Sequence, residues 1–545
     1  MSTREGIITY ADIRQRTEED RAGSVTSAQT VAVLSMLMLS VIVLSVLIFS
    51  NQSLRLDEAQ SLWQTSRDPI AMFRIIAQDV HVPLYHIMLH YWQQFIGNSV
   101  AAARMMSMIF FILLIPAVYI TGKRAYSSSV GLFAAVLVAA SPFLNWYGNE
   151  IRMYSLFALM TVLNQYFFIR IFMDRPSVRL ASEKTADVKG HIWLGYILTS
   201  VIGMFTHYFF AFNVIAQIIF FVAYRRHFPK PAMKAFLMIA LLGVILFVPW
   251  LYYVYHLGAA ANTQPALSEP TSIDIFNTFS QFLFGFQNDQ TNTILLSLWP
   301  LVVLLIFLSL RRNQKIEPQT AYLFVSLVMP ILLALMISEA WKPIYLTRYL
   351  ILSLPSLYLL ISWVLSTYPE RLAFFLRTAL VSIMIVTMAV EAVSAATPVK
   401  EDYRDASYYL ESRAKPTDVI VLSAPFTIYP FEYYYRGAAS VETLPLWDQY
   451  AAGPIPRFSP AELKSDAAKI EDSHQTLWLL LSYDQGYEKQ VKAYFDTHFQ
   501  KTDEAHFSSG IDLYAYRLRY DNTSLKAALK SISGPQPSGQ KGTLG

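Results

Sequence analysis

Long apolar stretches with few or no charged residues recur along most of the chain and limit the folds open to it. The first runs from Thr30 to Phe49, about the length that one helical bilayer crossing requires. Runs of this kind satisfy the hydropathy rule for membrane spans. We therefore expect an α-helical polytopic membrane protein with about eleven transmembrane helices, at roughly 30–49, 103–121, 130–147, 151–173, 192–206, 208–224, 235–256, 292–310, 320–338, 348–366 and 373–394.

The stretch 192–224 allows two interpretations, a single overlong helix or a hairpin of two short helices. The segments on both sides of it are basic, with Arg170 before it and Arg225 after it among several lysines and arginines. Basic segments lie in the cytoplasm under the positive-inside rule, so the chain must turn back between them. We expect that turn near Thr206-His207-Tyr208.

The same rule predicts the orientation of the whole chain. An odd number of spans leaves the N-terminal tail 1–28 in the cytoplasm and everything after about residue 397 outside. The tail is not a signal peptide, because the apolar stretch starts too late and runs too long. The expected location is the plasma (inner) membrane, with a transmembrane domain at 29–397 whose first outer loop is 51–102.

The composition excludes several classes of protein. Apolar residues make up 54% and charged residues 15% of the chain, which is unlike a disordered chain or a collagen. The absence of cysteine rules out a disulfide scaffold, a thiolate zinc site and a cysteine nucleophile. A formal net charge of only +4 argues against nucleic acid as a partner.

The segment 398–519 has a different pattern. Helical spacing at 402–413 and 487–498 alternates with short apolar runs at 418–424, 476–482 and 511–516. Strands that alternate with helices favour a small extracytoplasmic α/β domain with a partly parallel sheet. The tail 520–545 is rich in Ser, Gly, Pro and Gln and is expected to be disordered.

The first outer loop carries an acidic pair, Asp57-Glu58, soon after the first span. It continues with Asp79-Val-His81-Val-Pro83-Leu-Tyr85-His86, and its apolar residues suit helices that lie along the membrane interface. An acidic pair taken alone is more often a solvated turn than a site. Just beyond a helix end, however, one acid of the pair can face a cavity at the membrane.

Further ionisable and aromatic residues are expected at the outer ends of other spans. They are Arg104, Glu150, Arg152, Tyr154, His207, Tyr208, Arg348 and Tyr349. Each has an ordinary alternative: Arg104 can snorkel to headgroups, Glu150 can pair with Arg152 or cap a helix, and His207 can be a satisfied turn histidine. Ionisable groups at membrane depth are costly, and their gathering at one depth from several segments favours a functional site.

A site of this composition suits a lipid-linked phosphate, which is anionic and is held at the membrane surface by its tail. A nearby carboxylate suits the deprotonation of an acceptor hydroxyl. A polyprenyl phosphate is already a good leaving group, so one base and a cationic clamp suffice for a one-step, inverting displacement at a sugar carbon.

These residues stand in motifs whose order and spacing resemble a known family over about 50–520. The motifs are Leu56-Asp57-Glu58-Ala59, Asp79-x-His81-x-Pro83-Leu84-Tyr85, Arg104-Met-Met-Ser107, Ser141-Pro142, Glu150-Ile-Arg152-Met-Tyr154-Ser155, Thr206-His207-Tyr208-Phe209, Arg348-Tyr349-Leu350 and Asp402-Tyr-Arg404. The sequence is similar to membrane glycosyltransferases of the GT-C fold, in particular to the bacterial glycosyltransferase family 39 relatives of protein O-mannosyltransferases and of the lipid A aminoarabinose transferase.

The resemblance implies a hexosyl- or pentosyltransferase that uses a dolichyl- or undecaprenyl-phosphate sugar. It implies Asp57 as the general base and Glu58 as the supporting or alternative acid. From its place at the mouth of the fourth span, we expect Glu150 to be a second carboxylate that orients the acceptor or balances Arg152. His81 takes the place of the family's phosphate-binding basic residue, although Val82 stands where relatives often have proline. The rest of the expected donor- and phosphate-binding group is Tyr85, Arg104, Arg152, Tyr154, His207, Tyr208 and Arg348.

No metal and no cofactor is expected, and the acceptor is a lipid, a glycan or a protein. Two other classes remain open. A secondary transporter would place its ionisable residues near the bilayer midplane in paired repeats, whereas here they cluster at the outer ends and no repeat is visible. A non-catalytic membrane protein that binds glycans through the domain at 398–519 would be unaffected by loss of Asp57.

Overall fold

The computed structural model describes residues 26–49, 52–79, 81–173, 190–225, 230–257, 267–312, 316–394, 401–450, 455–471 and 474–518. The chain divides into two compact units. The first comprises Met1–Gln52 and Gln60–Pro398, and the second comprises Ser53–Ala59 and Val399–Gly545. The tail 520–545, for which we expect disorder, and nearly all of the N-terminal tail 1–28 lie outside the described residues.

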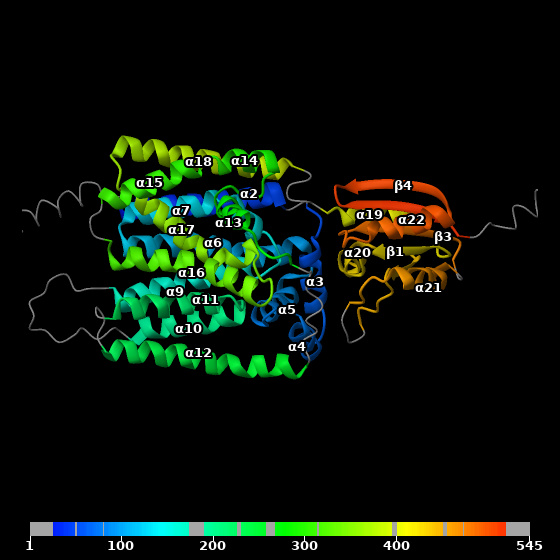
Figure 1. Cartoon of the computed structure of the whole chain (residues 1–545), viewed down its shortest axis with the longest axis horizontal. Coiled ribbons are helices and arrows are strands. Elements are labelled where there is room, and N and C mark those ends of the chain that lie inside the picture. Colours follow the sequence, from blue (N-terminus) through cyan, green and yellow to red (C-terminus); the bar gives the residue numbers. More distant parts are fainter. Residues whose placement is uncertain are drawn as a thin grey trace, which may run out of the picture. The chain divides into compact units, whose positions relative to one another are not determined.

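The first unit is helical, and its long helices run alongside one another (Figure 1). They are α2 (Ser27–Leu44), α6 (Val100–Ala125), α7 (Ser128–Ala140), α9 (Tyr154–Phe172), α10 (Gly190–Thr206), α11 (Phe210–Ala223), α12 (Lys230–His256), α15 (Trp299–Arg312), α16 (Pro318–Ala340), α17 (Leu354–Ser366) and α18 (Glu370–Val393). Shorter elements join them. They are a π-turn (Ser45–Phe49), α3 (Leu56–Thr65), α4 (Pro69–Gln78), α5 (Leu84–Ile96), α8 (Pro142–Gly148), α13 (Ser272–Phe284), α14 (Asp289–Leu296) and a 3-10 helix (Thr347–Ser353).

Eight helices within the described residues are long and apolar enough to cross a membrane. The pair α7 and α8 forms a further candidate that is bent by 62°. The bend follows from the sequence, because Ser141 caps the N-terminus of α8 and Pro142 occupies its first turn. Each predicted span thus coincides with a helix or a helix pair, and the protein is a multi-pass membrane protein with a mostly helical fold.

The stretch 192–224 forms two helices, α10 and α11, which are joined at His207 as the hairpin interpretation predicts. With 17 and 14 residues, they are shorter than the other candidate spans. A buried amide network, formed by Asn164, Tyr196, Asn213, Gln217 and Tyr322, connects them to α9 and α16.

The hydrogen bonds of the amide network centre on the side-chain amides of Asn164 and Gln217. Asn213 and Gln217 both donate to Oδ1 of Asn164, over 2.9 and 2.7 Å. Tyr196 donates to Oε1 of Gln217 over 2.6 Å, and Gln217 donates to the hydroxyl of Tyr322 over 3.1 Å. Polar groups at this depth have no water to bind, so satisfying them inside the bundle holds the short helices to their longer neighbours.

The second unit is an α/β domain, as the sequence predicts. Its sheet has the strand order β2-β1-β3-β5-β4, in which β1 pairs in parallel with β2 and β3, and β5 pairs antiparallel with β3 and β4. The strands are β1 (Val419–Ser423), β2 (Ser440–Thr443), β3 (Thr476–Ser482), β4 (Gln500–Ser508) and β5 (Ile511–Arg517). The helices are α19 (Tyr403–Arg413), α20 (Ile428–Tyr434), α21 (Pro460–Glu471) and α22 (Glu488–His498), with a 3-10 turn at Pro425–Thr427.

The core of the second unit explains the apolar runs of its parallel strands. Val419 and Val421 of β1 and Leu477 and Leu479 of β3 are fully buried, and Phe495 of α22 packs in the same cluster. A strand buried on both faces needs such an uninterrupted apolar sequence.

Candidate functional site

Asp79 lies at the C-terminal end of α4, where two glutamines of α3 hold its carboxylate. Its Oδ2 accepts hydrogen bonds from Gln64 over 2.8 Å and from Gln60 over 3.1 Å. The two glutamines are four residues apart on a helix and therefore lie on one face of it. Nε2 of His81 lies 3.8 Å from the same carboxylate oxygen.

His81 is a neutral acceptor in this arrangement. The guanidinium Nη2 of Arg152 lies 2.8 Å from Nε2 of His81, and both side chains are buried. A guanidinium has only donors, so the imidazole nitrogen must accept, and its proton is on Nδ1. The predicted basic residue for a donor phosphate is thus engaged by a cation, and its predicted role is not tested by this geometry.

Arg152 is fixed by the turn between α8 and α9. Its backbone N–H donates to the carbonyl of Glu150 over 2.7 Å, and its Nη1 donates to the hydroxyl of Ser61 over 3.2 Å. Its own carbonyl accepts the Ser107 hydroxyl over 3.2 Å. The Ser107 hydroxyl has one proton, which it donates to the Arg152 carbonyl. Tyr85 is therefore the donor in the 2.8 Å hydrogen bond between the Tyr85 and Ser107 hydroxyls.

His86 completes what we name the histidine–arginine cluster: Asp79, His81, His86 and Arg152. The rings of His81 and His86 stack with centroids 5.7 Å apart. Burial, followed by the electrostatic effects of the neighbouring His81 and Arg152, lowers the pKa of His86 to about 3. His86 is therefore neutral at physiological pH, and Arg152 is a permanent cation of the cluster.

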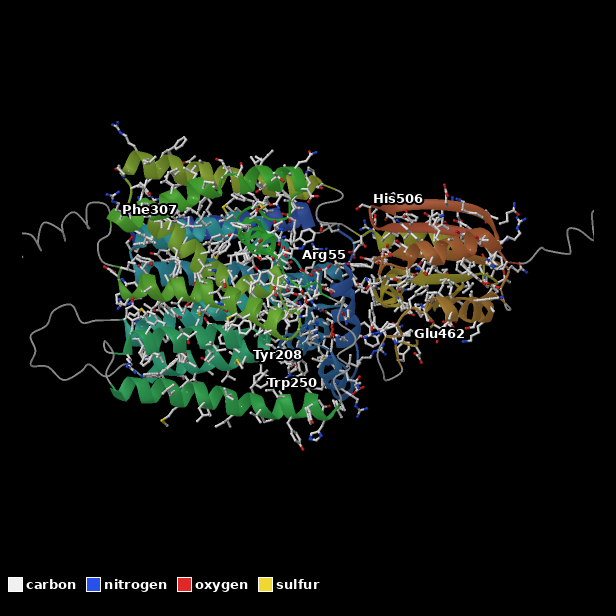
Figure 2. The ribbon with its side chains drawn as sticks, viewed as in Figure 1. Arg55, Tyr208, Trp250, Phe307, Glu462 and His506 are labelled. Carbon is white, nitrogen blue, oxygen red and sulfur yellow. The ribbon has the colours of Figure 1, made fainter. Side chains whose placement is uncertain are left out.

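Tyr208 and Trp250 connect this cluster to an apolar surface. The Tyr208 hydroxyl donates to the carbonyl of His81 over 3.3 Å and accepts the indole N–H of Trp250 over 3.0 Å. Tyr208 comes from the α10–α11 turn and Trp250 from α12 (Figure 2).

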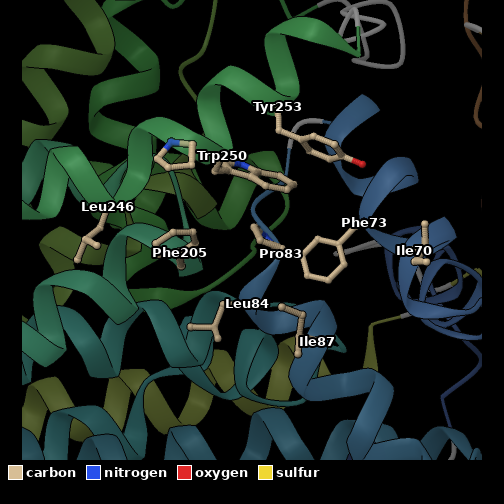
Figure 3. A pocket seen from close by; sticks show the side chains of 10 residues that line it. Ile70, Phe73, Pro83, Leu84, Ile87, Phe205, Leu246, Trp250 and Tyr253 are labelled. Atoms are coloured by element: carbon tan, nitrogen blue, oxygen red, sulfur yellow. The ribbon is translucent and has the colours of Figure 1, made fainter.

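Trp250 also lines an apolar groove of about 610 Å³ between α4, α5, α10 and α12 (Figure 3). Every lining side chain is apolar or aromatic. They are Ile70, Phe73, Pro83, Leu84, Ile87, Phe205, Leu246, Pro249, Trp250 and Tyr253. On one side the groove is bounded by α12, whose apolar side chains are mostly exposed. Its volume is within the range of roughly 300–1,000 Å³ that ligand sites occupy.

His207 forms a second aromatic group beside Arg152. Its ring stacks on Phe157 with centroids 4.8 Å apart and lies 5.1 Å from the ring of Tyr349. Its Nδ1 accepts the backbone N–H of Phe209 over 3.1 Å. Burial, followed by the charges of Arg152 and Arg348, lowers the pKa of His207 to about 3.

The remaining predicted residues have other surroundings. Arg348 lies in the 3-10 helix, with its guanidinium carbon 5.6 Å from the ring centroid of Tyr349. Tyr154 begins α9 and packs on Tyr147 with ring centroids 4.9 Å apart. Arg104 is buried and donates to the carbonyl of Gln52 over 3.0 Å.

The acidic pair lies in the first turn of α3. This turn belongs to the second unit, whereas α3 from Gln60 onward belongs to the first. Glu58 is fully buried, and its Oε2 accepts the backbone N–H of Arg55 over 3.0 Å. Asp57 is half-buried. The two carboxylates therefore differ in exposure. Glu58 binds the backbone at the N-terminus of its own helix, whereas Asp57 keeps partial access to solvent.

Several residues of the site could not be recognised from the sequence, because they carry no charge. Gln60, Gln64 and Ser61 are uncharged, and their only sequence signal is their spacing along one short helix. Trp250 stands within an apolar span, where nothing distinguishes a site residue from a lipid-facing one. Among the described residues no three ligating side chains converge on a possible metal position, and the expectation of metal-free chemistry stays a prediction.

A family model described as dolichyl-phosphate-mannose-protein mannosyltransferase matches residues 80–253. The structure of ArnT from Cupriavidus metallidurans in the apo state is similar with a TM-score of 0.59 and 10% identity, over 94% of this chain and 100% of that chain. The same protein bound to undecaprenyl phosphate gives a TM-score of 0.57 at 10% identity, with the same coverage of both chains.

The apo oligosaccharyltransferase of Archaeoglobus fulgidus is similar with a TM-score of 0.51 and 13% identity, over 86% of this chain and 71% of that chain. No curated protein matches the chain. Likeness at these identities concerns the fold, and the fold is the GT-C glycosyltransferase fold that the sequence predicts.

Proposed function

We propose that this protein transfers a sugar from a polyprenyl-phosphate donor to an acceptor hydroxyl at the outer face of the plasma (inner) membrane. The N-terminus is then cytoplasmic and the second unit extracytoplasmic. The sugar is a hexose or a pentose, and the acceptor is a lipid, a glycan or a protein. The reaction proceeds with inversion and without a metal.

The observation that carries the proposal is the connection between the apolar groove and Arg152. Trp250 lines the groove and binds Tyr208, Tyr208 binds His81, and His81 binds Arg152. A ligand that fills the groove with an apolar chain would therefore bring its head group to a buried cation. A polyprenyl phosphate has this combination of a long apolar tail and an anionic head.

The charges of the site suit a phosphate. Arg152 and Arg348 both act on the pKa of His207, so two permanent cations lie near one imidazole. His207 and His86 are neutral and add no charge, but each can offer one N–H donor. When a phosphate oxygen takes the Nη2 donor of Arg152, it replaces the neutral nitrogen of His81 with a charged acceptor, which forms the stronger hydrogen bond.

Asp57 is the proposed general base. It is four residues before Ser61 on α3, so the two side chains lie on one face of that helix, and Ser61 accepts from Arg152. In the proposed step, the acceptor oxygen attacks the anomeric carbon of the sugar while Asp57 takes the hydroxyl proton. The bond from that carbon to the phosphate oxygen breaks, and the polyprenyl phosphate leaves with the electron pair.

The comparisons support this reaction class. ArnT has been solved with undecaprenyl phosphate bound, and the matching family model is described as dolichyl-phosphate-mannose-protein mannosyltransferase. Both descriptions include a polyprenyl phosphate.

The test is sugar transfer by the purified protein in vesicles. Radiolabelled polyprenyl-phosphate hexoses and pentoses are supplied with a membrane extract as acceptor, and the labelled product is identified by mass spectrometry. A covalent glycoside of inverted configuration is the expected result. Label that crosses the vesicle membrane without a new covalent product would refute the proposal in favour of the transporter.

A further inference from the structure

The second unit has a topological switch point between β1 and β3. The chain leaves β1 for β2 on one side of it, and then crosses to β3 on the other side. The crossover elements are α20 between β1 and β2, and α21 between β2 and β3. In open parallel sheets, ligands bind beyond the carboxyl ends of the strands at this point.

Here the chain's own segment Ser53–Ala59 is bound by Tyr434, which follows β1, and by Glu401 and Arg404, which precede β1. The backbone N–H of Leu54 donates to the hydroxyl of Tyr434, over 2.9 Å, at the end of the helix that follows β1. The N–H of Leu56 donates to Oε2 of Glu401 over 3.2 Å. The hydroxyl of Ser53 accepts the N–H of Arg404 over 3.3 Å.

Glu401 is held in turn by the residue that directly follows β3. The hydroxyl of Tyr483 donates to Oε1 of Glu401. Tyr483 has a backbone φ of +59°, which is uncommon for a residue with a large side chain. A conformation of this kind persists where the surrounding structure imposes it, and it often marks a functional contact. Tyr403, two residues after Glu401, binds the last residue of β3 through its hydroxyl, 2.7 Å from Oγ of Ser482.

Burial makes these contacts rigid. Leu54 and Glu58 are fully buried, and Arg55 and Glu401 are each 8% exposed. Buried backbone donors need partners. Moving the segment away from the second unit would break the hydrogen bonds of the Leu54 and Leu56 N–H groups and would cost free energy.

We propose that the second unit positions the general base, with Glu401 and Tyr434 as the positioning residues that hold the first turn of α3 and thereby orient Asp57. The inference rests on the proposed function, because it takes Asp57 to be the base. It gives the second unit a part in turnover. Neither positioning residue touches a reacting atom, so their loss should alter the rate of proton removal more than the binding of the donor.

The test compares Glu401→Ala and Tyr434→Phe with Tyr408→Phe, a control at an exposed tyrosine of α19. Glu401→Ala and Tyr434→Phe should each speed amide exchange in 53–59 and lower kcat by roughly ten- to a hundredfold, with the donor KM unchanged. Tyr408→Phe should change neither quantity. Glu401→Gln should restore most of kcat, because its amide oxygen can still accept the Leu56 N–H. Tyr434→Phe removes a single hydroxyl, so it gives a folded variant if Glu401→Ala does not fold.

Unchanged exchange in both variants overturns the inference. Faster exchange with unchanged kcat overturns it as well, because the segment would then be held without effect on the base. A wild-type protein that transfers no sugar contradicts the proposed function, while the exchange data still decide whether the second unit holds the segment. Normal turnover by Asp57→Asn would instead show that another acid is the base.

Discussion

Replacing Glu401 with glutamine should abolish a loss of folding stability that the second unit undergoes as the pH rises. Burial raises the pKa of Glu401 to about 7 from its ordinary value of 4.5, and the negative charge of Asp57 adds to the rise. Hydrogen bonds from Tyr483 and Leu56 and the charge of Arg55 oppose it without cancelling it. The protonated carboxyl is therefore the form that the folded unit prefers.

The sign and the size follow from linkage. Because folding raises this pKa, the contribution of Glu401 to stability is fully present below about pH 4.5 and is lost as the pH rises through about 7. At about 1.36 kcal/mol per pKa unit, the loss is about 3 kcal/mol. Glutamine has the shape of the protonated acid and does not ionise, so Glu401→Gln should equal the wild type near pH 4.5 and exceed it in stability at pH 8.

The assay is amide hydrogen exchange of the full chain in detergent, followed by mass spectrometry on peptides from β1 and β3. Opening free energies are compared between about pH 5 and 8 after correction for intrinsic exchange. The matched control is Glu442→Gln, an exposed glutamate of β2, which should keep the wild-type slope. Equal pH slopes in the wild type and Glu401→Gln would refute the reasoning, since Glu401 would then not change its protonation on folding.

Other substitutions test the proposed site directly. Asp57→Asn should lower turnover by roughly 10²–10⁴-fold while donor binding is retained, as measured by single-turnover transfer. Arg152→Gln should weaken donor binding by about 1.5–3 kcal/mol, the worth of a charge-assisted hydrogen bond, in a radioligand assay. Ile87→Trp should fill the apolar groove and raise KM for long-chain donors more than for short-chain ones, whereas Leu241→Trp on exposed α12 surface should change neither. Treatment with a chelator should leave turnover unchanged, and activity restored only by an added divalent ion would contradict the metal-free mechanism.

Much of the fold could be predicted because the bilayer imposes a simple pattern on sequence. Uncharged runs such as 30–49 and 320–338 mark helices directly, since a spanning segment must be apolar and must satisfy its own backbone. The bend at Ser141 has a local signal as well, because a capping serine followed by proline starts a new helix. The apolar strands β1 and β3 likewise identified a partly parallel sheet.

The contacts within the site could not be predicted in the same way. Leu56 and Glu401 are separated by 345 residues, and no local pattern marks Glu401 as the acceptor of a backbone N–H. The role of Gln60 and Gln64 depends on the end of α4, which brings Asp79 to their face of α3. Burial, which sets the pKa of His207 and Glu401, arises from packing by distant segments and leaves no trace beside either residue in the sequence.

The short hairpin of α10 and α11 has a consequence for the surrounding lipid. At about 1.5 Å of rise per residue, the 17 described residues of α10 and the 14 residues of α11 extend about 25 and 21 Å, against a hydrocarbon core of about 30 Å. A short span is accommodated by local thinning of the bilayer, by flanking residues that reach the interface or by association with other helices. Because the amide network keeps both helices in place, we expect the bilayer to become thinner beside them. The apolar groove borders α10. A lipid that enters the groove beside this helix would pass through the thinner region, where its head group moves a shorter distance through hydrocarbon. Thicker bilayers made from longer acyl chains should therefore slow the loading of a lipid-linked substrate.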